Sequence, residues 1–400
     1  MTTYNFDKIT NRKGTNCLKY DFAVERGKPA DVLPLWVADM DFPVSEEITK
    51  SLHAAVDHGI YGYTQPKDAY YNALMNWMER NHNWKTEREW IVKTPGVVFA
   101  LGAAVKAFTD PGDAILIQNP VYYPFTNIIR DNDRRVVDNT LIYEKTTGQS
   151  GDNGYRIDFE DFERKLEQEH IKLFILCNPH NPVGRVWTVE ELQQLGEICL
   201  RHHVIVVSDE IHNDFVYPGY EHTVFAKVDP RFAEFTVTCT APSKTFNLAG
   251  LQISNIFIPN EKLRKAFQTE IDKTGYDEPN ALGIVACEAA YRAGEDWLEQ
   301  LRAYLLQNLN FLREYLQKKI PQIHLVEPEG TYLVWLDCSE LGITGKELDQ
   351  FIVDKAGLWL DGGSMFGPSG AAFQRVNIAC PRATLQLALD KLKTAVDTLK

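Results

Sequence analysis

The sequence lacks any apolar run that approaches the roughly 20 residues needed to cross a membrane. Its beginning, MTTYNFDKITNRKGTNCLKYDF, also lacks the apolar centre of a secretory signal. These absences argue against a membrane-inserted or secreted protein, and we expect a cytoplasmic one.

Cysteines are few, and their spacing follows no pattern. The 400 residues include 7 cysteines without a CxxC pair, so neither a disulfide framework nor a metal site is expected. The formal net charge of −13 disfavours nucleic acid and anionic membrane surfaces as partners. What remains is an ordinary globular composition, with 44% hydrophobic and 24% charged residues.

The length of the chain and its apolar runs predict an α/β protein. A chain of 400 residues exceeds one typical core, so two domains are expected. Helix-like segments separate short, almost continuously apolar runs, and one such helix starts at Thr188, with Glu191 completing a capping box, and ends near His202. This alternation predicts a mostly parallel sheet, buried on both faces by helices. The apolar runs are 114–117, 172–177, 204–207, 235–240 and 253–258.

The pattern changes near residue 285. Residues 286–319 form a long amphipathic pattern with few helix breakers, and strands are predicted at 332–336 and 375–379. We therefore expect a large domain at 45–285 and a smaller α+β domain from 1–44 and 286–400. A cleft between two such domains is the usual place for a small-molecule site.

Polar side chains follow three of the predicted strands. They occur in NPHNPVGR (178–185), in SDEIH (208–212) and in the dipeptide SK (243–244). The intervals are 28 residues (209 minus 181) and 35 residues (244 minus 209), each about one strand–helix–strand crossover. Because ligands bind at the carboxyl ends of parallel strands, an amide, a carboxylate and an amine are predicted to converge.

This ordered set resembles the class I/II aminotransferase family of fold-type I enzymes that use pyridoxal 5′-phosphate (PLP). The segments LPLWVADMDFP (33–43), YGYTQP (61–66), DEIH and SKTFNLAGLQ are most similar to the cystathionine β-lyase branch, the carbon–sulfur lyases. The resemblance extends from Leu33 to Arg382. It implies a large domain with a mostly parallel seven-stranded sheet flanked by helices, plus a smaller α+β domain.

The resemblance implies a role for each polar residue at the strand ends. Lys244 would bond to the cofactor aldehyde and act as a base, Asp209 would pair with the pyridinium nitrogen, and Asn181 would bond to the phenolic oxygen. Tyr122 would stack on the ring. The structural alternatives are a surface lysine, a helix-capping Asp209, a turn asparagine and a tyrosine that packs in the core.

The cofactor phosphate would be bound by backbone amides where a loop enters a helix, at Gly96, Val97 and Val98, together with Ser243. Tyr63 resembles the family tyrosine that reaches the phosphate of the neighbouring subunit, with Tyr61 as the second candidate. The resemblance therefore implies a homodimer whose active sites lie at the subunit interface.

Arg375 resembles the arginine that binds the substrate α-carboxylate, for which a planar guanidinium is suited. The alternative is a surface arginine in an ion pair. Asn181, Trp36, Asp39 and Tyr61 complete the expected amino-acid substrate site.

Two positions depart from the common family pattern. Gln252 stands where many members carry an arginine that grips the phosphate, and His212 stands where many have a tyrosine. The phosphate would then depend on amides, hydroxyls and Tyr63. His212 is shared with the lyase branch; it is either a cofactor contact or a structural histidine.

The function implied by the resemblance is carbon–sulfur β-elimination, which yields a thiol, pyruvate and ammonia. An aminotransferase shares every cofactor residue and remains the first alternative, although no arginine can be assigned to a second substrate carboxylate. A regulatory or binding protein that retains the fold is the second alternative. Retention of the full set of polar residues argues against it.

Overall fold

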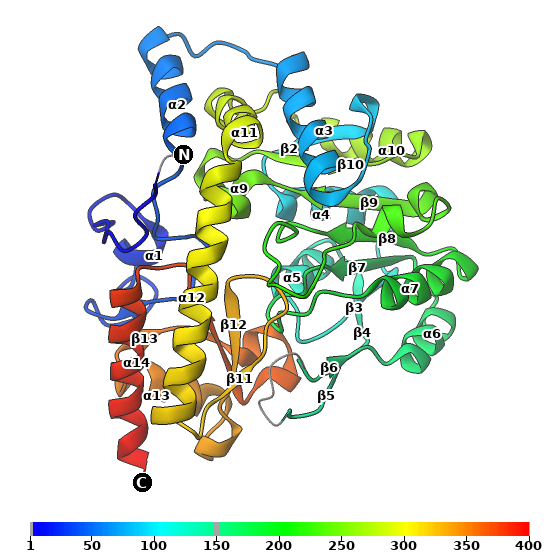
Figure 1. Ribbon diagram of the computed structural model, residues 1–400. Helices are drawn as coiled ribbons and strands as arrows, with labels where there is room; N and C mark the ends of the chain where they lie inside the picture. Colours follow the sequence, from blue (N-terminus) through cyan, green and yellow to red (C-terminus); the bar gives the residue numbers. More distant parts are fainter. Residues whose placement is uncertain (1–2, 147–152, 400) are drawn as a thin grey trace.

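The computed structural model describes residues 3–146 and 153–399. Its centre is a seven-stranded sheet in the order β2-β10-β9-β8-β7-β3-β4, parallel except for the pairings of β10 (Figure 1). The strands are β2 (Ile91–Thr94), β3 (Ala114–Ile117), β4 (Arg135–Asp138), β7 (Leu173–Cys177), β8 (Ile205–Asp209), β9 (Thr236–Thr240) and β10 (Ser254–Phe257).

Helices cover both faces of this sheet, which explains why its strands are continuously apolar. Ile175 and Val207 pack with α4, α5 and α10, whereas Phe174 and Val206 pack with α6 and α7. Neighbouring residues of one strand therefore enter different cores. The helices are α4 (Val97–Phe108), α5 (Pro124–Asp131), α6 (Phe159–Gln168), α7 (Val189–Arg201), α8 (Phe225–Val228), α9 (Pro242–Thr245) and α10 (Glu261–Asp272).

The predicted helix at 188–202 is confirmed as α7. The side chain of Thr188 accepts a hydrogen bond from the amide of Glu191, and the Glu191 side chain bonds back to the amide of Thr188. This reciprocal cap satisfies two amides that the first turn leaves unpaired. The predicted pattern at 286–319 is instead divided between α11 (Ala281–Ala293) and α12 (Glu295–Lys319), which meet at Gly294.

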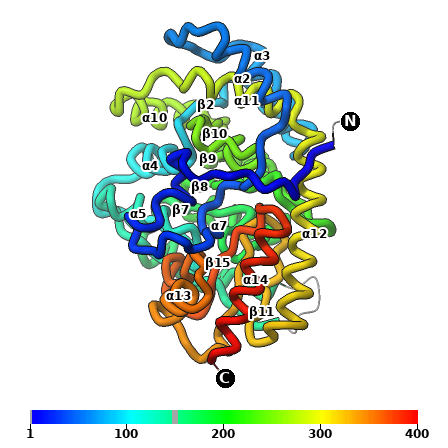
Figure 2. The backbone as a smooth tube through the Cα atoms, turned by 90° about the vertical axis from the view of Figure 1, so that its left-hand side faces the viewer, coloured from blue at the N-terminus to red at the C-terminus, as the bar shows by residue number. Residues whose placement is uncertain are grey.

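A second sheet of four strands lies below the first in Figure 1, beside α12 and α14 (Arg382–Val396), in the order β11-β12-β15-β14. The N-terminal segment joins this region, because β1 pairs in parallel with β13. Figure 2 shows that segment, in blue, crossing the middle of the molecule. The remaining elements are α1 (Leu18–Asp21), β1 (Leu33–Pro34), α2 (Glu46–His58), α3 (Asp68–His82), β5 (Ile142–Tyr143), β6 (Tyr155–Arg156), β11 (His324–Val326), β12 (Leu333–Asp337), α13 (Gly345–Asp354), β13 (Leu358–Trp359), β14 (Asp361–Gly362) and β15 (Phe373–Asn377).

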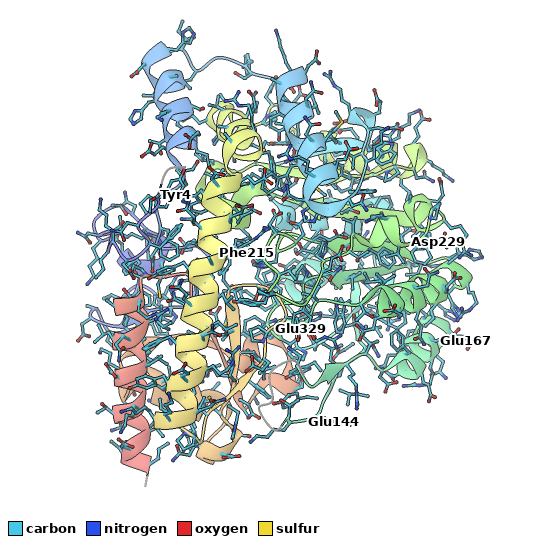
Figure 3. All side chains as sticks on the ribbon, viewed as in Figure 1. Tyr4, Glu144, Glu167, Phe215, Asp229 and Glu329 are labelled. Carbon is cyan, nitrogen blue, oxygen red and sulfur yellow. The ribbon has the colours of Figure 1, made fainter. Side chains whose placement is uncertain are left out.

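Charged side chains lie mainly at the surface, as Asp229 and Glu167 do near the edge of the molecule, whereas Phe215 lies within it (Figure 3). Glu329 is an exception: it is buried and forms an ion pair with Arg185. In the part of the chain that the structure describes, no helix combines the length and the apolar character needed to cross a membrane.

Candidate active site

The strand ends that the sequence singled out meet at one cavity of about 190 Å³. β7, β8 and β9 are parallel and aligned, with Cys177 opposite Asp209 and Asp209 opposite Cys239. Their following loops therefore open at the same edge of the sheet. Nine of the predicted site residues line this cavity: Gly96, Val97, Val98, Tyr122, Asn181, Asp209, His212, Ser243 and Lys244.

Lys244 lies in α9, the short helix that follows β9. Its Nζ donates a hydrogen bond of 2.9 Å to the carbonyl oxygen of Ala38. Burial lowers the pKa of Lys244 to about 8, because a charged ammonium loses water there. The amine can therefore be neutral close to physiological pH, as a nucleophile or base must be.

Asp209 ends β8 and is buried. Its carboxylate accepts a hydrogen bond of 3.2 Å from the amide of Ile211, and no helix begins between β8 and α8 within the described residues. The helix-capping alternative therefore does not describe this residue. Burial raises the pKa of Asp209 to about 7, so a nearby cation would be needed to keep the carboxylate ionised.

Arg375 lies on β15 of the second sheet and reaches the cavity through Asn181. Its Nη1 donates to Asn181 Oδ1 at 3.0 Å, and its Nη2 donates to the carbonyl oxygen of Trp36 at 3.0 Å. Asp361 forms an ion pair with the same guanidinium. Arg375 is only 3% exposed, and within residues 3–146 and 153–399 its Nε has no hydrogen-bond partner. It is therefore a buried cation with an unused donor, which differs from the surface arginine of the alternative interpretation.

The amides of Gly96 and its neighbours lie at the beginning of α4, a helix of 12 residues. Helix N-termini attract anions because their first amides are unpaired. Ser243 and Gln252 line the cavity as well, so Gln252 lies in the same pocket although it is not the arginine common in the family. This edge of the cavity therefore suits a phosphate group.

His212 also lines the cavity, and its ring packs edge-on against Tyr332. Burial lowers the pKa of His212 well below its ordinary value, and the positive charges of Lys244 and Arg375 lower it further. Its Nδ1 has no hydrogen-bond partner among the residues that the structure describes. The imidazole is therefore a neutral group with one ring nitrogen that these residues leave unpaired.

Tyr122 combines the two readings that the sequence left open. Its ring lines the cavity and also packs edge-on against Phe125, with centroids 5.9 Å apart. Tyr122 therefore borders both the cavity and the core.

Besides Arg375, which reaches the cavity only through Asn181, four predicted residues lie outside the cavity lining. Trp36 contributes its carbonyl oxygen to Arg375, but its ring stacks on Trp359 with centroids 4.3 Å apart. Asp39 forms an ion pair with Arg12. Tyr61 and Tyr63 are exposed, Tyr63 to 95%, and line a surface groove with residues 278–282.

Ala38 was not among the predicted site residues, although its carbonyl contacts Lys244. Ala38 lies within LPLWVADMDFP (33–43), one of the segments that carried the family resemblance. A backbone oxygen carries no residue-type signal, so the sequence could not identify the atom.

The side chains around the cavity suit PLP by their chemistry. They combine an amine of lowered pKa, a buried carboxylate, an amide, an aromatic face and a helix N-terminus. The unpartnered Nδ1 of His212 and Nε of Arg375 add hydrogen-bonding groups that only a ligand or solvent could satisfy. An aldehyde-bearing pyridine phosphate and an amino-acid carboxylate match this set.

Comparison with known proteins agrees with the site. Cystathionine β-lyase PatB of Bacillus subtilis (strain 168) is 45% identical over 392 residues, which cover 98% of this chain and 100% of PatB. Cystalysin from Treponema denticola, which contains a PLP cofactor, has a TM-score of 0.94 at 37% identity over 100% of both chains. The PLP-bound C–S lyase from Staphylococcus hominis has a TM-score of 0.91 at 35% identity, covering 99% of this chain and 98% of that one.

The family model described as aminotransferase class I and II matches residues 30–392. The family, the fold class and the PLP cofactor expected from the sequence are confirmed by these matches. The chain belongs to the aminotransferase class I and II family.

Proposed function

We propose that this protein is a PLP-dependent carbon–sulfur β-lyase that converts a cysteine S-conjugate such as cystathionine into a thiol, pyruvate and ammonia. The observation that carries the proposal is the meeting of Lys244, Asp209 and Asn181 at one cavity, with Arg375 bonded to Asn181. The sequence prediction of a lyase is confirmed by the similarity to PatB and to the Staphylococcus hominis lyase.

Each residue has a task in this reaction. Arg375 binds the substrate carboxylate and so orients the Cα–H bond toward Lys244. Lys244, neutral at working pH, removes the Cα proton and can return a proton later. PLP supplies the electron sink for the negative charge that develops at Cα. Asp209 is the counter-charge for the pyridinium, and Asn181 is the donor to the phenolic oxygen.

The active enzyme is a homodimer in this proposal, and Tyr63 of each subunit reaches the phosphate site of the other. Support comes from the strong exposure of Ile60, Tyr61 and Tyr63 on one segment, because clustered exposed apolar side chains mark interaction surfaces. The proposal also includes a cytoplasmic location and a division into a large domain at 45–285 and a small one from 1–44 and 286–400. The separate seven- and four-stranded sheets support that division.

The deciding experiment supplies purified, PLP-loaded protein with cystathionine and no keto acid. We expect sustained release of pyruvate and thiol, and loss of at least about a thousandfold in rate for Lys244→Ala. Turnover that requires an added keto acid would instead identify an aminotransferase. Absence of turnover with either substrate set would favour the binding protein.

A further inference from the structure

The amine of Lys244 is held in place by a backbone carbonyl that is far away in the sequence. The oxygen of Ala38 accepts from Lys244 Nζ at 2.9 Å and from the hydroxyl of Tyr332 at 3.0 Å. Ala38 belongs to the loop of residues 37–41, which follows β1. The position of this loop therefore decides where the amine lies.

Side chains from two other parts of the chain hold the loop. Asn377 Nδ2 donates to the carbonyl oxygens of Val37 and Asp39, both at 2.7 Å. Asn247 accepts from the amide of Met40 at 2.9 Å and donates to its carbonyl at 3.0 Å. Two asparagine side chains therefore hold the loop backbone, Asn377 from the second sheet and Asn247 from the segment after α9.

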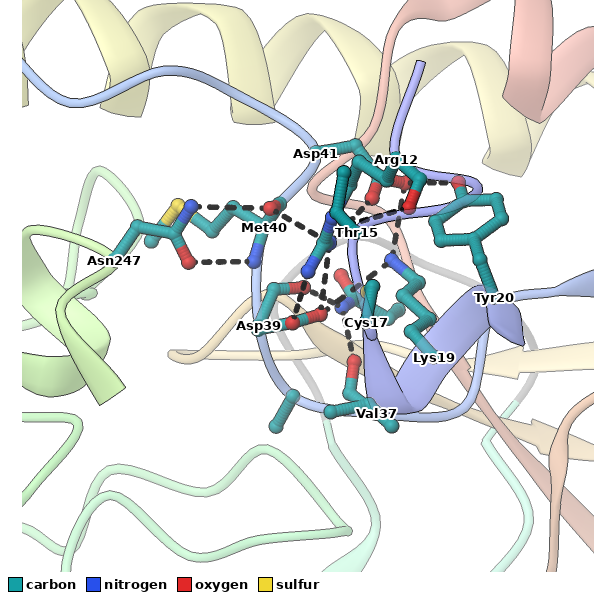
Figure 4. Close-up of polar contacts among 12 residues, drawn as sticks. Arg12, Thr15, Cys17, Lys19, Tyr20, Val37, Asp39, Met40, Asp41 and Asn247 are labelled. Carbon is teal, nitrogen blue, oxygen red and sulfur yellow. Dashed lines mark hydrogen bonds and ion pairs between the residues drawn. The ribbon is translucent and has the colours of Figure 1, made fainter. Parts of the chain in front are cut away.

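The N-terminal segment completes the support with ion pairs, shown in Figure 4. Arg12 contacts Asp39 at 2.6 Å and Asp41 at 2.8 Å, and Lys19 contacts Asp41 at 3.0 Å. Tyr20 donates to Asp41 at 3.0 Å. We refer to these five residues as the Arg12–Asp41 cluster.

The cluster is buried enough for its charges to matter. Lys19 is fully buried and Asp41 is 5% exposed. Two cations face two carboxylates, so the pairing offsets the cost of removing these charges from water. Loss of one partner leaves the other three with an unbalanced charge beside the loop.

The protonation of Lys244 depends on the charges of the cluster, because several charged and titratable groups face its amine. Asp39 and Asp209 favour its protonated form, and Arg375 disfavours it. His212, Tyr332, Tyr122 and Cys177 are further titratable groups around it. Asp39 is thus shared: Arg12 at 2.6 Å and Lys19 at 3.8 Å neutralise it on one side, and its residual charge acts on Lys244 on the other.

We propose that the Arg12–Asp41 cluster is a positioning device for Lys244. It fixes the loop that carries the Ala38 carbonyl, and the opposed charges of Arg12 and Asp39 set how strongly the site favours a proton on the Lys244 nitrogen. Asp39, expected from the family resemblance to contact substrate, acts here as a positioning residue. The proposal rests on the assignment of Lys244 as the residue that bonds to PLP.

The test is a pH titration of the visible absorbance band of the PLP-loaded protein, which reports the proton on the Lys244 nitrogen. Asp39→Asn removes a carboxylate that favours the proton, so the midpoint should fall by about half a pH unit or more. Arg12→Met removes the neutralising cation, so the midpoint should rise by a similar amount. Arg12→Lys should restore most of the wild-type value, because it keeps the charge.

Opposite shifts cannot come from a general loss of structure, which would move both variants in the same sense. Asp68→Asn, which breaks the exposed ion pair with Arg88, is the matched control and should leave the midpoint unchanged. Thermal unfolding of each variant is measured in parallel. Equal midpoints in all variants, or shifts of the same sign, would overturn the proposal and leave the cluster a purely structural role. A visible band that survives Lys244→Ala would instead overturn the assignment of Lys244.

Discussion

Asp209 is a carboxylate in a place where its own charge is costly. It is 4% exposed, and its carboxylate accepts a hydrogen bond from the amide of Ile211. Without a cation beside it, burial raises its pKa to about 7, well above the value near 4 of an unfolded chain. The ionised carboxylate of Asp209 therefore lowers the unfolding free energy of the cofactor-free protein, and such perturbed groups are typical of functional sites.

Asp209→Asn should stabilise the cofactor-free protein at neutral pH. A carboxyl whose folded pKa is raised carries no penalty below about pH 4, and the full penalty above about pH 7. We expect the variant to gain on the order of 4 kcal/mol in unfolding free energy at pH 8 and little at pH 4. Urea denaturation at both pH values measures this gain.

The same variant should lose at least about a hundredfold in lyase rate, because Asn cannot supply the negative charge expected beside the pyridinium. A variant less stable than wild type at pH 8 would contradict the interpretation. Retention of full activity would show that Asp209 is not the ring partner.

Arg375 offers a test of substrate recognition. Arg375→Lys keeps the charge but loses the planar fork, so we expect KM for an amino-acid substrate to rise about tenfold or more. Gln374→Ala is the control, because Gln374 points to the other side of the sheet and bonds to Asp349. Steady-state kinetics should show a raised KM only for the Arg375 variant; equal changes in both would indicate damage to β15.

Residue type and spacing were enough to predict that Asn181, Asp209 and Lys244 meet at one edge of the sheet. Each of these side chains carries a polar group that is unusual at the end of a buried strand. Residue type and spacing could not identify Ala38, whose role depends on a backbone oxygen, nor the pairing of Arg12 with Asp39. Those contacts depend on tertiary packing between segments that carry no motif of their own.

At the scale of elements, the continuous apolar runs predicted five strands of the central sheet correctly. β2 and β4 were missed because polar residues interrupt their apolar runs, namely the partly buried Lys93 in β2 and the exposed Arg135 in β4. The pattern at 286–319 hid a break at Gly294, where an added Cβ would meet Phe246 at 2.4 Å. Periodicity records which face of a helix is apolar, and two consecutive helices can share that pattern.

Two helix-interior glycines allow a matched prediction about packing. A Cβ on Gly196 in α7 would lie 2.0 Å from the ring of Phe232. One on Gly102 in α4 would have no atom of the described residues within 4 Å, apart from its chain neighbours and the nearby backbone of α4. Gly196→Ala should therefore destabilise the fold by about 1–3 kcal/mol through overpacking. Gly102→Ala should stabilise it by up to about 1 kcal/mol, because alanine favours the helix. Thermal unfolding that ranks the two variants in the reverse order would refute this packing argument.

At the scale of the whole molecule, the proposed dimer predicts complementation between inactive subunits. Lys244→Ala lacks the base of its own site, and Tyr63→Ala lacks the phosphate contact it offers to its neighbour. In a mixed dimer one site carries both defects and the other carries neither. Mixing unfolded chains of the two variants and refolding them together should therefore restore about a quarter of wild-type activity.

Each variant refolded alone is the control and should stay near its own low activity. A mixture no more active than the mean of the two variants would place Tyr63 in its own subunit's site or outside any site. Light scattering on the same samples reports whether they are dimers.

The contact between Lys244 and Ala38 also has a consequence for how the protein is made. The cavity needs a carbonyl from near the start of the chain, strand ends from the middle and, through Asn181, an arginine close to the end. A ribosome must release the chain as far as Arg375 before these groups can meet. PLP binding therefore follows the synthesis of most of the chain, and a chain that ends before Arg375 should not bind PLP.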